Sequence, residues 1–384
     1  MRYFIKADRF LLENEEKKHS YLLIKNGKFG GFVDQVPDGE QVFDYSKFTV
    51  APGLFDTHIH GISGHDVMDG QPEAIEGISR SLLKSGVTRF LPTTLTAPDR
   101  EIERAISSIV TAVAAGLSGA QSEGIYIEGP FFTEKYRGAQ NPLYLKDPSI
   151  ELFQKWQQQA QGSIIKIALA PERSGSLAFI EAVRNEGIFV SIGHTNARFD
   201  QVNAAIRSGA NNFTHLFNGM AGLHHRDPGV VGAAFFQESA YAELICDGHH
   251  VHPAIVRLAL QIMGDRLVLI SDCMRAGLMP DGEYMLGEFK VQMSNGVART
   301  ETGALAGSTL TLIQAVKNLY EWSEYPLYKI WHLASLSPAA SIRKDEELGS
   351  IAKGKIADYV VIDQNFNIYA TAIAGEVKYQ AANL

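Results

Sequence analysis

Short apolar runs alternate with longer amphipathic segments through the middle of the chain. Most residues in these runs are apolar, which is typical of parallel strands that are covered on both faces. The segments between them carry apolar residues at helical spacing. We count eight such runs, at residues 53–58, 87–92, 124–128, 164–170, 188–194, 212–217, 242–246 and 267–272.

Two of the intervening helices can be delimited from their capping residues. Residues 96–99, TAPD, resemble a capping box, and the apolar spacing that follows ends at Gly116. A second helix is predicted to begin at Pro253 and to end by Gly264. Its predicted apolar side consists of Ile255, Val256, Leu258, Ala259 and Ile262.

The two ends of the chain show a different pattern. Residues 1–50 contain strand-like runs separated by turn residues such as Asn26-Gly27, and a similar stretch follows Gly349. We therefore predict that residues 1–51 and 346–384 pair into one small β-sandwich domain. For residues 52–345 the alternation predicts an α/β fold, a (β/α)8 TIM-type barrel, with a doubly wound open sheet as the alternative.

Composition and charge are those of a globular protein with a large core. Of 384 residues, 45% are hydrophobic and 20% charged, and 35 basic against 43 acidic residues give a net charge of -8. Because no long basic run is present, nucleic acid is not an expected partner. No apolar run reaches 18 residues, and Lys6, Asp8 and Arg9 interrupt the N-terminal one, so we expect a cytoplasmic protein without a membrane partner.

Polar side chains stand at the carboxyl ends of several predicted strands. His58 and His60 close the first run at positions i and i+2. In a strand, residues at this spacing point to the same face, so both imidazoles would face the same way. The third, fifth, sixth and eighth runs end at or near Glu128, His194, His215 and Asp272. One such residue is usually structural. Six of them would converge at the same end of a barrel, which indicates a metal site.

Imidazole nitrogens combined with a carboxylate define the chemistry of this site. Such ligands favour Zn²⁺ and also suit Fe²⁺, Mn²⁺ or Co²⁺. A bound divalent ion lowers the pKa of water and polarises a carbonyl, so it supports hydrolysis near neutral pH. Asp272 is the natural general base, because a carboxylate beside the water can take its proton and pass it to a leaving amine.

Several motifs surround these strand-end residues. They are EGPFF with RGAQNP, LAPE, GHTNA, THLFNGM followed by HRDPGVVGA, DGHHV, SDCM and LAGSTLT. The arrangement resembles the amidohydrolase superfamily, whose members are metal hydrolases on a (β/α)8 barrel. More narrowly, the chain from about residue 50 to the end is similar to the N-acetylglucosamine-6-phosphate deacetylases. This resemblance implies hydrolysis of N-acetyl-D-glucosamine 6-phosphate to D-glucosamine 6-phosphate and acetate, in amino-sugar catabolism.

The resemblance also implies roles for individual residues. Glu128, His194 and His215 would hold the catalytic ion, with Asp272 as acid and base. A second ion would be held by His58 and His60 and bridged by Glu128, so one or two ions are expected. Arg226 would pair with the substrate phosphate, reaching it from the neighbouring subunit of a homodimer. The implied substrate contacts are Ala139, Gln140, Asn218, Gly219, Arg226, His250, Leu305, Ala306 and Gly307.

Two other functions stay open at this point. Another amidohydrolase, acting on a cyclic amide or an aminopurine, would have no need of Arg226. A non-catalytic barrel that binds a sugar phosphate would be expected to have lost a metal ligand or Asp272, and the sequence retains all of them.

Overall fold

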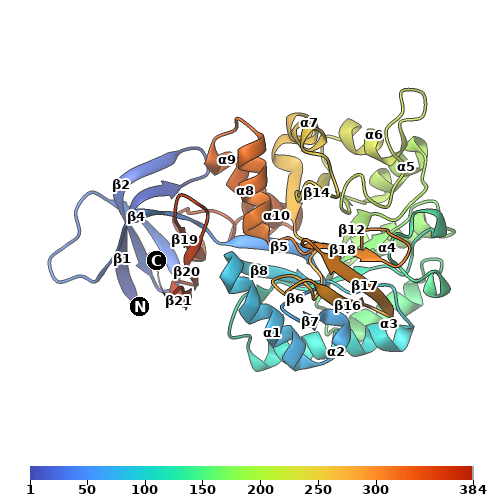
Figure 1. Ribbon diagram of the computed structural model, residues 1–384, viewed down its shortest axis with the longest axis horizontal. Coiled ribbons are helices and arrows are strands. Elements are labelled where there is room, and N and C mark those ends of the chain that lie inside the picture. The colour runs from blue at the N-terminus through green and yellow to red at the C-terminus, as the bar shows by residue number, and fades with distance from the viewer. Residues whose placement is uncertain (383–384) are drawn as a thin grey trace.

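Eight parallel strands, one from each predicted apolar run, surround the centre of the larger part of the molecule (Figure 1). The computed structural model describes residues 1–382. The strands are β5 (Leu54–Ile59), β8 (Val87–Pro92), β10 (Ile125–Glu128), β11 (Ile164–Leu169), β12 (Phe189–Ile192), β13 (Asn212–Phe213), β14 (Tyr241–Ile245) and β15 (Leu267–Ile270). Nearly all of their residues are buried, which explains why most residues in the runs are apolar.

Backbone pairing closes these strands into a ring. Strands β10 to β15 form one sheet in chain order, and β5 pairs in parallel with β8. A bridge between Thr93 and Tyr126 joins the β8 side to β10, and the Asp272 backbone N–H donates to the His58 carbonyl at 2.9 Å. The last strand therefore returns to the first, as a barrel requires. The (β/α)8 prediction is confirmed, and the open-sheet alternative is wrong.

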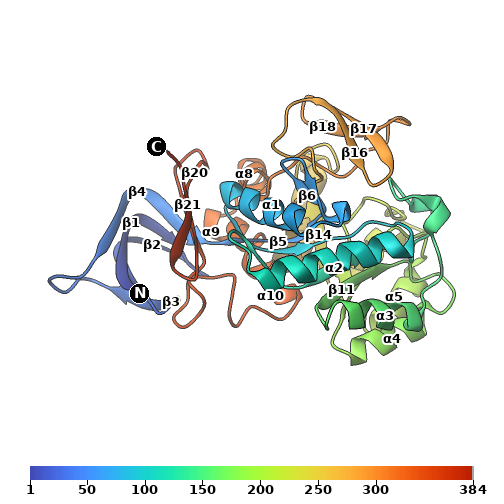
Figure 2. The same cartoon turned by 90° about the horizontal axis from the view of Figure 1, so that it is seen from below.

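A helix follows each barrel strand and covers the outside of the ring (Figures 1 and 2). No helix within residues 1–382 combines the length and the apolar character needed to cross a membrane. The helices are α1 (Pro72–Leu82), α2 (Asp99–Ala115), α3 (Ile150–Gln159), α4 (Ser176–Asn185), α5 (Phe199–Ser208), α6 (Gly229–Phe236), α7 (Pro253–Met263), α8 (Leu312–Trp322), α9 (Leu327–His332) and α10 (Leu336–Ser341).

The predicted end of α2 at Gly116 and both predicted boundaries of α7 agree with the structure. The capping box predicted at residues 96–99 is wrong, because α2 begins at Asp99 after Pro98 and no side chain caps it. The predicted buried face of α7 is partly wrong. Ile255, Leu258 and Ile262 are 39%, 41% and 41% exposed, whereas Leu260 and Met263 are buried beside Val256 and Ala259. Apolar residues surround much of this helix, so their spacing alone could not select the face that meets the barrel.

Both ends of the chain build a single seven-stranded sheet beside the barrel, and the N- and C-termini lie in this small domain (Figure 1). Its central strand β4 pairs in parallel with β1 and antiparallel with β19, which confirms that the two termini share one β domain. The sheet curls around its own core, because the Phe29 N–H donates to the Lys355 carbonyl at 3.0 Å and Ala357 N–H to the Gly27 carbonyl at 2.8 Å. The strands are β1 (Arg2–Leu11), β2 (Glu16–Lys25), β3 (Lys28–Val33), β4 (Val42–Pro52), β19 (Tyr359–Ile362), β20 (Ile368–Ile373) and β21 (Glu376–Gln380).

A three-stranded antiparallel sheet between β15 and α8 was not predicted from the sequence. It consists of β16 (Gly282–Leu286), β17 (Phe289–Ser294) and β18 (Val297–Thr300), and it projects from the barrel at upper right in Figure 2. Leu286, Val291 and Met293 bury one face of this sheet against Met274 and Ala306. Shorter strands elsewhere are β6 (Gly61–Ile62), β7 (His65–Asp66) and β9 (Gln121–Ser122).

Candidate metal centre and active site

The six polar residues predicted at the strand ends lie together at one end of the barrel. They form two clusters, and within each cluster the candidate ligand atoms are all within 4.8 Å of one another. The first cluster is Glu128, His194 and His215; the second cluster is His58, His60 and Asp272. All six side chains are buried, so the barrel holds them in a protected environment.

Glu128 lies between the two clusters. Its Oε1 atom is 3.4 Å from His194 Nε2 and 3.3 Å from His215 Nε2, both in the first cluster. Toward the second cluster, its Oε2 atom is 3.5 Å from His60 Nε2, and Oε1 is 3.6 Å from His58 Nε2. A single carboxylate therefore faces four imidazoles.

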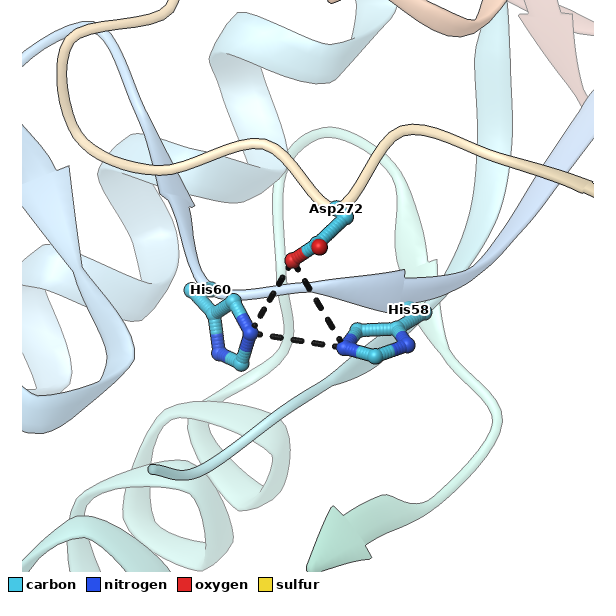
Figure 3. A group of neighbouring side chains, drawn as sticks. All are labelled: His58, His60 and Asp272. Carbon is cyan, nitrogen blue, oxygen red and sulfur yellow. Dashed lines mark hydrogen bonds and ion pairs between the residues drawn. The ribbon is translucent and has the colours of Figure 1, made fainter. Parts of the chain in front are cut away.

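Asp272 faces both histidines of the second cluster (Figure 3). Its Oδ1 atom is 3.2 Å from His60 Nε2 and 3.7 Å from His58 Nε2, and the two ring nitrogens are 3.3 Å apart. His58 lies in β5 and His60 directly follows it, whereas Asp272 follows β15 on the neighbouring side of the closed ring. Barrel closure thus completes this cluster.

Each of the four histidines holds its Nδ1 atom against an acceptor outside the clusters. A carbonyl or carboxylate accepts, so Nδ1 carries the proton and Nε2 presents a lone pair to the site. Four such lone pairs, together with two carboxylates, have no shared protons to satisfy them, and a divalent cation fits among them. The pairs are His60 with the Thr93 carbonyl (3.1 Å), His194 with the Tyr136 carbonyl (2.9 Å), His215 with the Asn218 carbonyl (3.1 Å) and His58 with the Glu243 carboxylate (2.9 Å).

Three cluster residues have a left-handed backbone conformation that residues other than glycine rarely adopt. The φ angles of His194, His215 and Asp272 are 46°, 29° and 49°. Each such residue costs about 1–3 kcal/mol and persists only where its surroundings fix it. Strain at the ends of three barrel strands is consistent with a functional site rather than with a structural role.

Electrostatics at the centre favour anionic carboxylates. Burial raises the pKa of Glu128. When no ion is bound and the imidazoles are protonated, the positive charge of His58 and hydrogen bonds from His194 and His215 outweigh burial and hold this pKa well below its ordinary value. Burial also opposes ionisation of Asp272, yet His58 and His60 bring its pKa to about 2. Two buried negative charges in one place attract a cation.

A cavity opens onto the clusters, and most of the predicted substrate-binding residues line it. These are Ala139, Gln140, Asn218, Gly219, His250, Leu305 and Gly307. Leu95, Gly138, Leu286 and Ala304 also line the cavity and were not predicted from the sequence. Leu286 belongs to the unpredicted sheet, whose alternating pattern and Asn295-Gly296 turn were the available signal.

Two predicted residues do not line this cavity. Ala306 is buried in the apolar core beneath the β16–β18 sheet. Its neighbour in the sequence, Leu305, lines the cavity. Arg226 is exposed, in the loop between β13 and α6.

Gln140 is fixed by two hydrogen bonds at the rim of the clusters. Its Nε2 donates to Glu128 Oε2 at 2.8 Å, and its Oε1 accepts from the Thr96 backbone N–H at 2.9 Å. These partners orient the amide, and one N–H remains for a ligand in the cavity.

A further pair of charged residues, Lys166 and Glu243, lies inside the barrel and was also missed. Both stand within apolar runs of the sequence, where a lone charge was the only signal. Burial raises the pKa of Glu243, but Lys166 and His58 outweigh it and bring this pKa to about 2. Glu243 is therefore a buried carboxylate in contact with a cluster histidine.

The barrel and its histidine–carboxylate clusters are those of a metal-dependent hydrolase, and comparison with known proteins agrees. The Amidohydrolase family model matches residues 49–378, so the chain belongs to the amidohydrolase family. The narrower resemblance to N-acetylglucosamine-6-phosphate deacetylases is also confirmed. The enzyme of that name from Vibrio furnissii is 43% identical over 86% of this chain and 83% of the relative.

Two more relatives extend this comparison. N-acetylgalactosamine-6-phosphate deacetylase from Escherichia coli O157:H7 is 38% identical over 98% of this chain and 99% of its own. Mutant N-acetyl-D-glucosamine-6-phosphate deacetylase from Mycobacterium smegmatis, solved in complex with N-acetyl-D-glucosamine-6-phosphate, superposes with a TM-score of 0.92. It is 31% identical and covers 99% of this chain and 100% of its own.

Proposed function

We propose that this chain is a metal-dependent deacetylase that hydrolyses N-acetyl-D-glucosamine 6-phosphate to D-glucosamine 6-phosphate and acetate, in amino-sugar catabolism. The observation that carries the proposal is the convergence of four Nε2 lone pairs and two carboxylates at the base of one cavity. The names of the relatives from Vibrio furnissii and Mycobacterium smegmatis support the choice of substrate.

The two clusters fit one divalent ion each, with Zn²⁺ favoured and Fe²⁺, Mn²⁺ or Co²⁺ also suited. We propose that the first cluster holds the ion that hydrolysis requires, and that the second cluster holds a second ion with Glu128 shared between them. When bound, such an ion supplies Lewis-acid activation of water and of the amide carbonyl.

Asp272 is the proposed general base and acid. Because its pKa is about 2, it is anionic at neutral pH and can accept the proton of the attacking water. The same proton then goes to the nitrogen as the carbon–nitrogen bond breaks, so the sugar leaves as an amine. The free N–H of Gln140 can donate to the acetyl carbonyl, and this amide stays neutral throughout.

His250 is the proposed contact to the sugar ring. It lines the cavity, and its Nδ1 is 2.6 Å from the Asp247 carboxylate, which orients the ring. The other ring nitrogen is then available to a sugar hydroxyl. Asn218, Gly219 and Leu305 line the same cavity and complete the proposed sugar site.

Arg226 is the proposed phosphate ligand, acting in the active site of the neighbouring subunit of a homodimer. A guanidinium binds phosphate through two parallel hydrogen bonds. Arg226 is exposed and does not line the cavity of its own chain, and Leu223 in the same loop is 56% exposed. An exposed apolar side chain beside the cation supports a subunit contact at this loop.

The cytoplasmic location stays a prediction from the sequence.

Acetate release by the purified protein tests the proposal. N-acetylglucosamine 6-phosphate is compared with its unphosphorylated form and with N-acetylgalactosamine 6-phosphate, and a chelator-treated sample is the control. We expect fast, chelator-sensitive release from the phosphorylated glucosamine derivative. The galactosamine arm is included because of the relative from Escherichia coli O157:H7. If neither phosphorylated sugar releases acetate, the substrate assignment is wrong and cyclic amides are tested next.

The variant Arg226→Ala separates the deacetylase from amidohydrolases of uncharged substrates. Loss of a charge-assisted hydrogen bond of about 1.5–3 kcal/mol would raise KM by about 10- to 100-fold with kcat little changed. Arg257→Ala, at an exposed arginine on α7, is the control and should leave both constants unchanged. An unchanged KM in Arg226→Ala would remove Arg226 from the site.

A further inference from the structure

A buried ion pair crosses the interior of the barrel next to the two clusters. Lys166 on β11 and Glu243 on β14 are 0% and 1% exposed, and the lysine ammonium donates to Glu243 Oε1. Strands β12 and β13 separate β11 from β14 in the sheet, so the pair spans the barrel. Two apolar side chains could occupy this space without the desolvation penalty of two charges. The presence of the carboxylate therefore indicates a further interaction that requires it.

The second oxygen of Glu243 contacts both clusters. Glu243 Oε2 accepts from His58 Nδ1 at 2.9 Å and from the His215 backbone N–H at 3.3 Å. His58 belongs to the second cluster, and its Nε2 faces Glu128 and Asp272. His215 belongs to the first cluster and has the strained φ of 29°. One carboxylate thus touches a side chain of one cluster and the backbone of the other.

His58 differs in this contact from the other three cluster histidines. Their Nδ1 atoms donate to the backbone carbonyls of Thr93, Tyr136 and Asn218, whose positions are set by the fold itself. A carboxylate acceptor makes a stronger hydrogen bond than a carbonyl and increases the basicity of the ring.

Lys166 fixes the carboxylate in turn. Its ammonium holds the other oxygen of Glu243 and lies 4.4 Å from the centroid of the Tyr126 ring, an additional attraction in a buried environment. The Tyr126 hydroxyl is within 2.9 Å of Thr214 Oγ1, in the segment that leads to His215. The lysine is therefore held by the same part of the barrel that carries the clusters.

We propose that Glu243, held in place by Lys166, is a positioning residue of the metal centre. It fixes the tautomer and orientation of His58 so that Nε2 faces the ion, and it anchors the strained backbone of His215. This inference rests on the proposed metal centre but not on the identity of the substrate, so it is tested by metal binding rather than by turnover.

Zinc affinity, measured by competition with a chromogenic chelator, is the first test. The double variant Lys166→Met/Glu243→Leu removes both charges and the acceptor together, so no buried charge is left unpaired. We expect at least one zinc equivalent to bind about 10- to 100-fold more weakly than in the wild type, the usual effect of removing such a partner. Glu243→Gln keeps an acceptor without its charge and should be intermediate. If the double variant does not fold, the zinc affinity of Glu243→Gln tests the inference in its place.

A largely buried ion pair elsewhere provides the control. Arg89 Nε is 2.6 Å from Asp358 Oδ2, and this pair joins β8 to the small β domain. Asp358→Asn breaks this pair, whose side chains are 12% and 7% exposed, and should leave zinc affinity unchanged. A loss of affinity equal to that of Glu243→Gln would show that any buried pair has this effect, and the inference would be wrong.

The tautomer of His58 is the second test, read from long-range ¹H–¹⁵N correlations of the metal-free protein. We expect the proton on Nδ1 in the wild type and a mixture of tautomers in the double variant, with His60 unchanged as the internal control. If zinc affinity and the His58 tautomer are both unaffected, Glu243 has no positioning role and the proposed function stands. If the wild type binds none of Zn²⁺, Fe²⁺, Mn²⁺ and Co²⁺, both proposals are wrong.

Discussion

The two clusters use the same residue types but reach their positions by different means. In the first cluster, His194 and His215 follow the short strands β12 and β13 and have left-handed backbone conformations. In the second cluster, His58 lies within β5 and His60 directly follows it, so strand alternation alone places both rings on one side. The two histidines of the first cluster therefore depend on turns, and those of the second on the alternation of side chains along β5.

The supports behind the two clusters also differ. Backbone carbonyls hold both histidines of the first cluster, whereas the Glu243 carboxylate holds His58 in the second. Side chains are easier to change than backbone atoms, so the second cluster should be the more sensitive of the two to substitutions around it. Glu128 belongs to the first cluster and faces the second, and it offers the most direct way to test how independent they are.

The largest effect is expected from Glu128→Gln. The substitution removes the one charge that faces four imidazoles, so both clusters should lose affinity for metal. Activity should fall by at least about 10⁴-fold, because the Lewis acid is lost with the ion. Metal content and kcat of the purified variant check this. Glu123→Gln is the control. Glu123 Oε1 is 2.7 Å from Arg89 Nη1, away from both clusters, and this variant should retain metal. Full metal content in Glu128→Gln would show that Glu128 is not a ligand.

Asp272→Asn should separate metal binding from chemistry. Asparagine keeps the shape but cannot accept the proton of water, so kcat should fall by about 10²- to 10⁴-fold. The first cluster does not include Asp272, and its ion should remain. Metal analysis and kcat are measured on the same sample. Near-normal turnover would remove Asp272 from the mechanism.

The barrel and both clusters could be predicted from the sequence because buried parallel strands are apolar and their polar ends converge. His58, Glu128 and Asp272 each follow or close such a run, and this placement was sufficient to bring them together. What could not be predicted depends on contacts across the fold. The partner of His58 is Glu243, which lies 185 residues away in sequence, and only barrel closure makes them neighbours. The exposed Ile255 of α7 was misplaced for a similar reason, because its surroundings are set by packing.

Two single substitutions should show which of the two clusters hydrolysis depends on more. His194→Asn removes a ligand of the first cluster, and we expect activity to be lost with the ion that hydrolysis requires. His60→Asn removes a ligand of the second cluster and should reduce zinc from two equivalents to one, with activity lowered by about 10- to 100-fold. Zinc stoichiometry and kcat/KM of both variants decide the ranking. Equal losses of activity would mean that hydrolysis needs both ions.

The smallest effect is expected from Gln140→Ala. The Gln140 amide donates to Glu128 Oε2, which is the oxygen that faces His60, whereas Oε1 lies closer to the two histidines of the first cluster than to His58. Its loss should weaken the second zinc by about 10-fold or less and leave the first unchanged. The Thr96 N–H also loses its acceptor, so the free energy of unfolding should fall by about 1–3 kcal/mol.

A glutamine far from the clusters separates these two consequences of Gln140→Ala. Gln201 Oε1 accepts from the Arg198 backbone N–H at 2.9 Å at the start of α5, so Gln201→Ala should also lower the free energy of unfolding. It touches no cluster residue and should leave both zinc affinities unchanged. If Gln140→Ala weakened the first zinc as much as the second, the two oxygens of Glu128 could not act separately. The clusters would then be one site that responds as a unit, because every change at Glu128 would reach all four imidazoles.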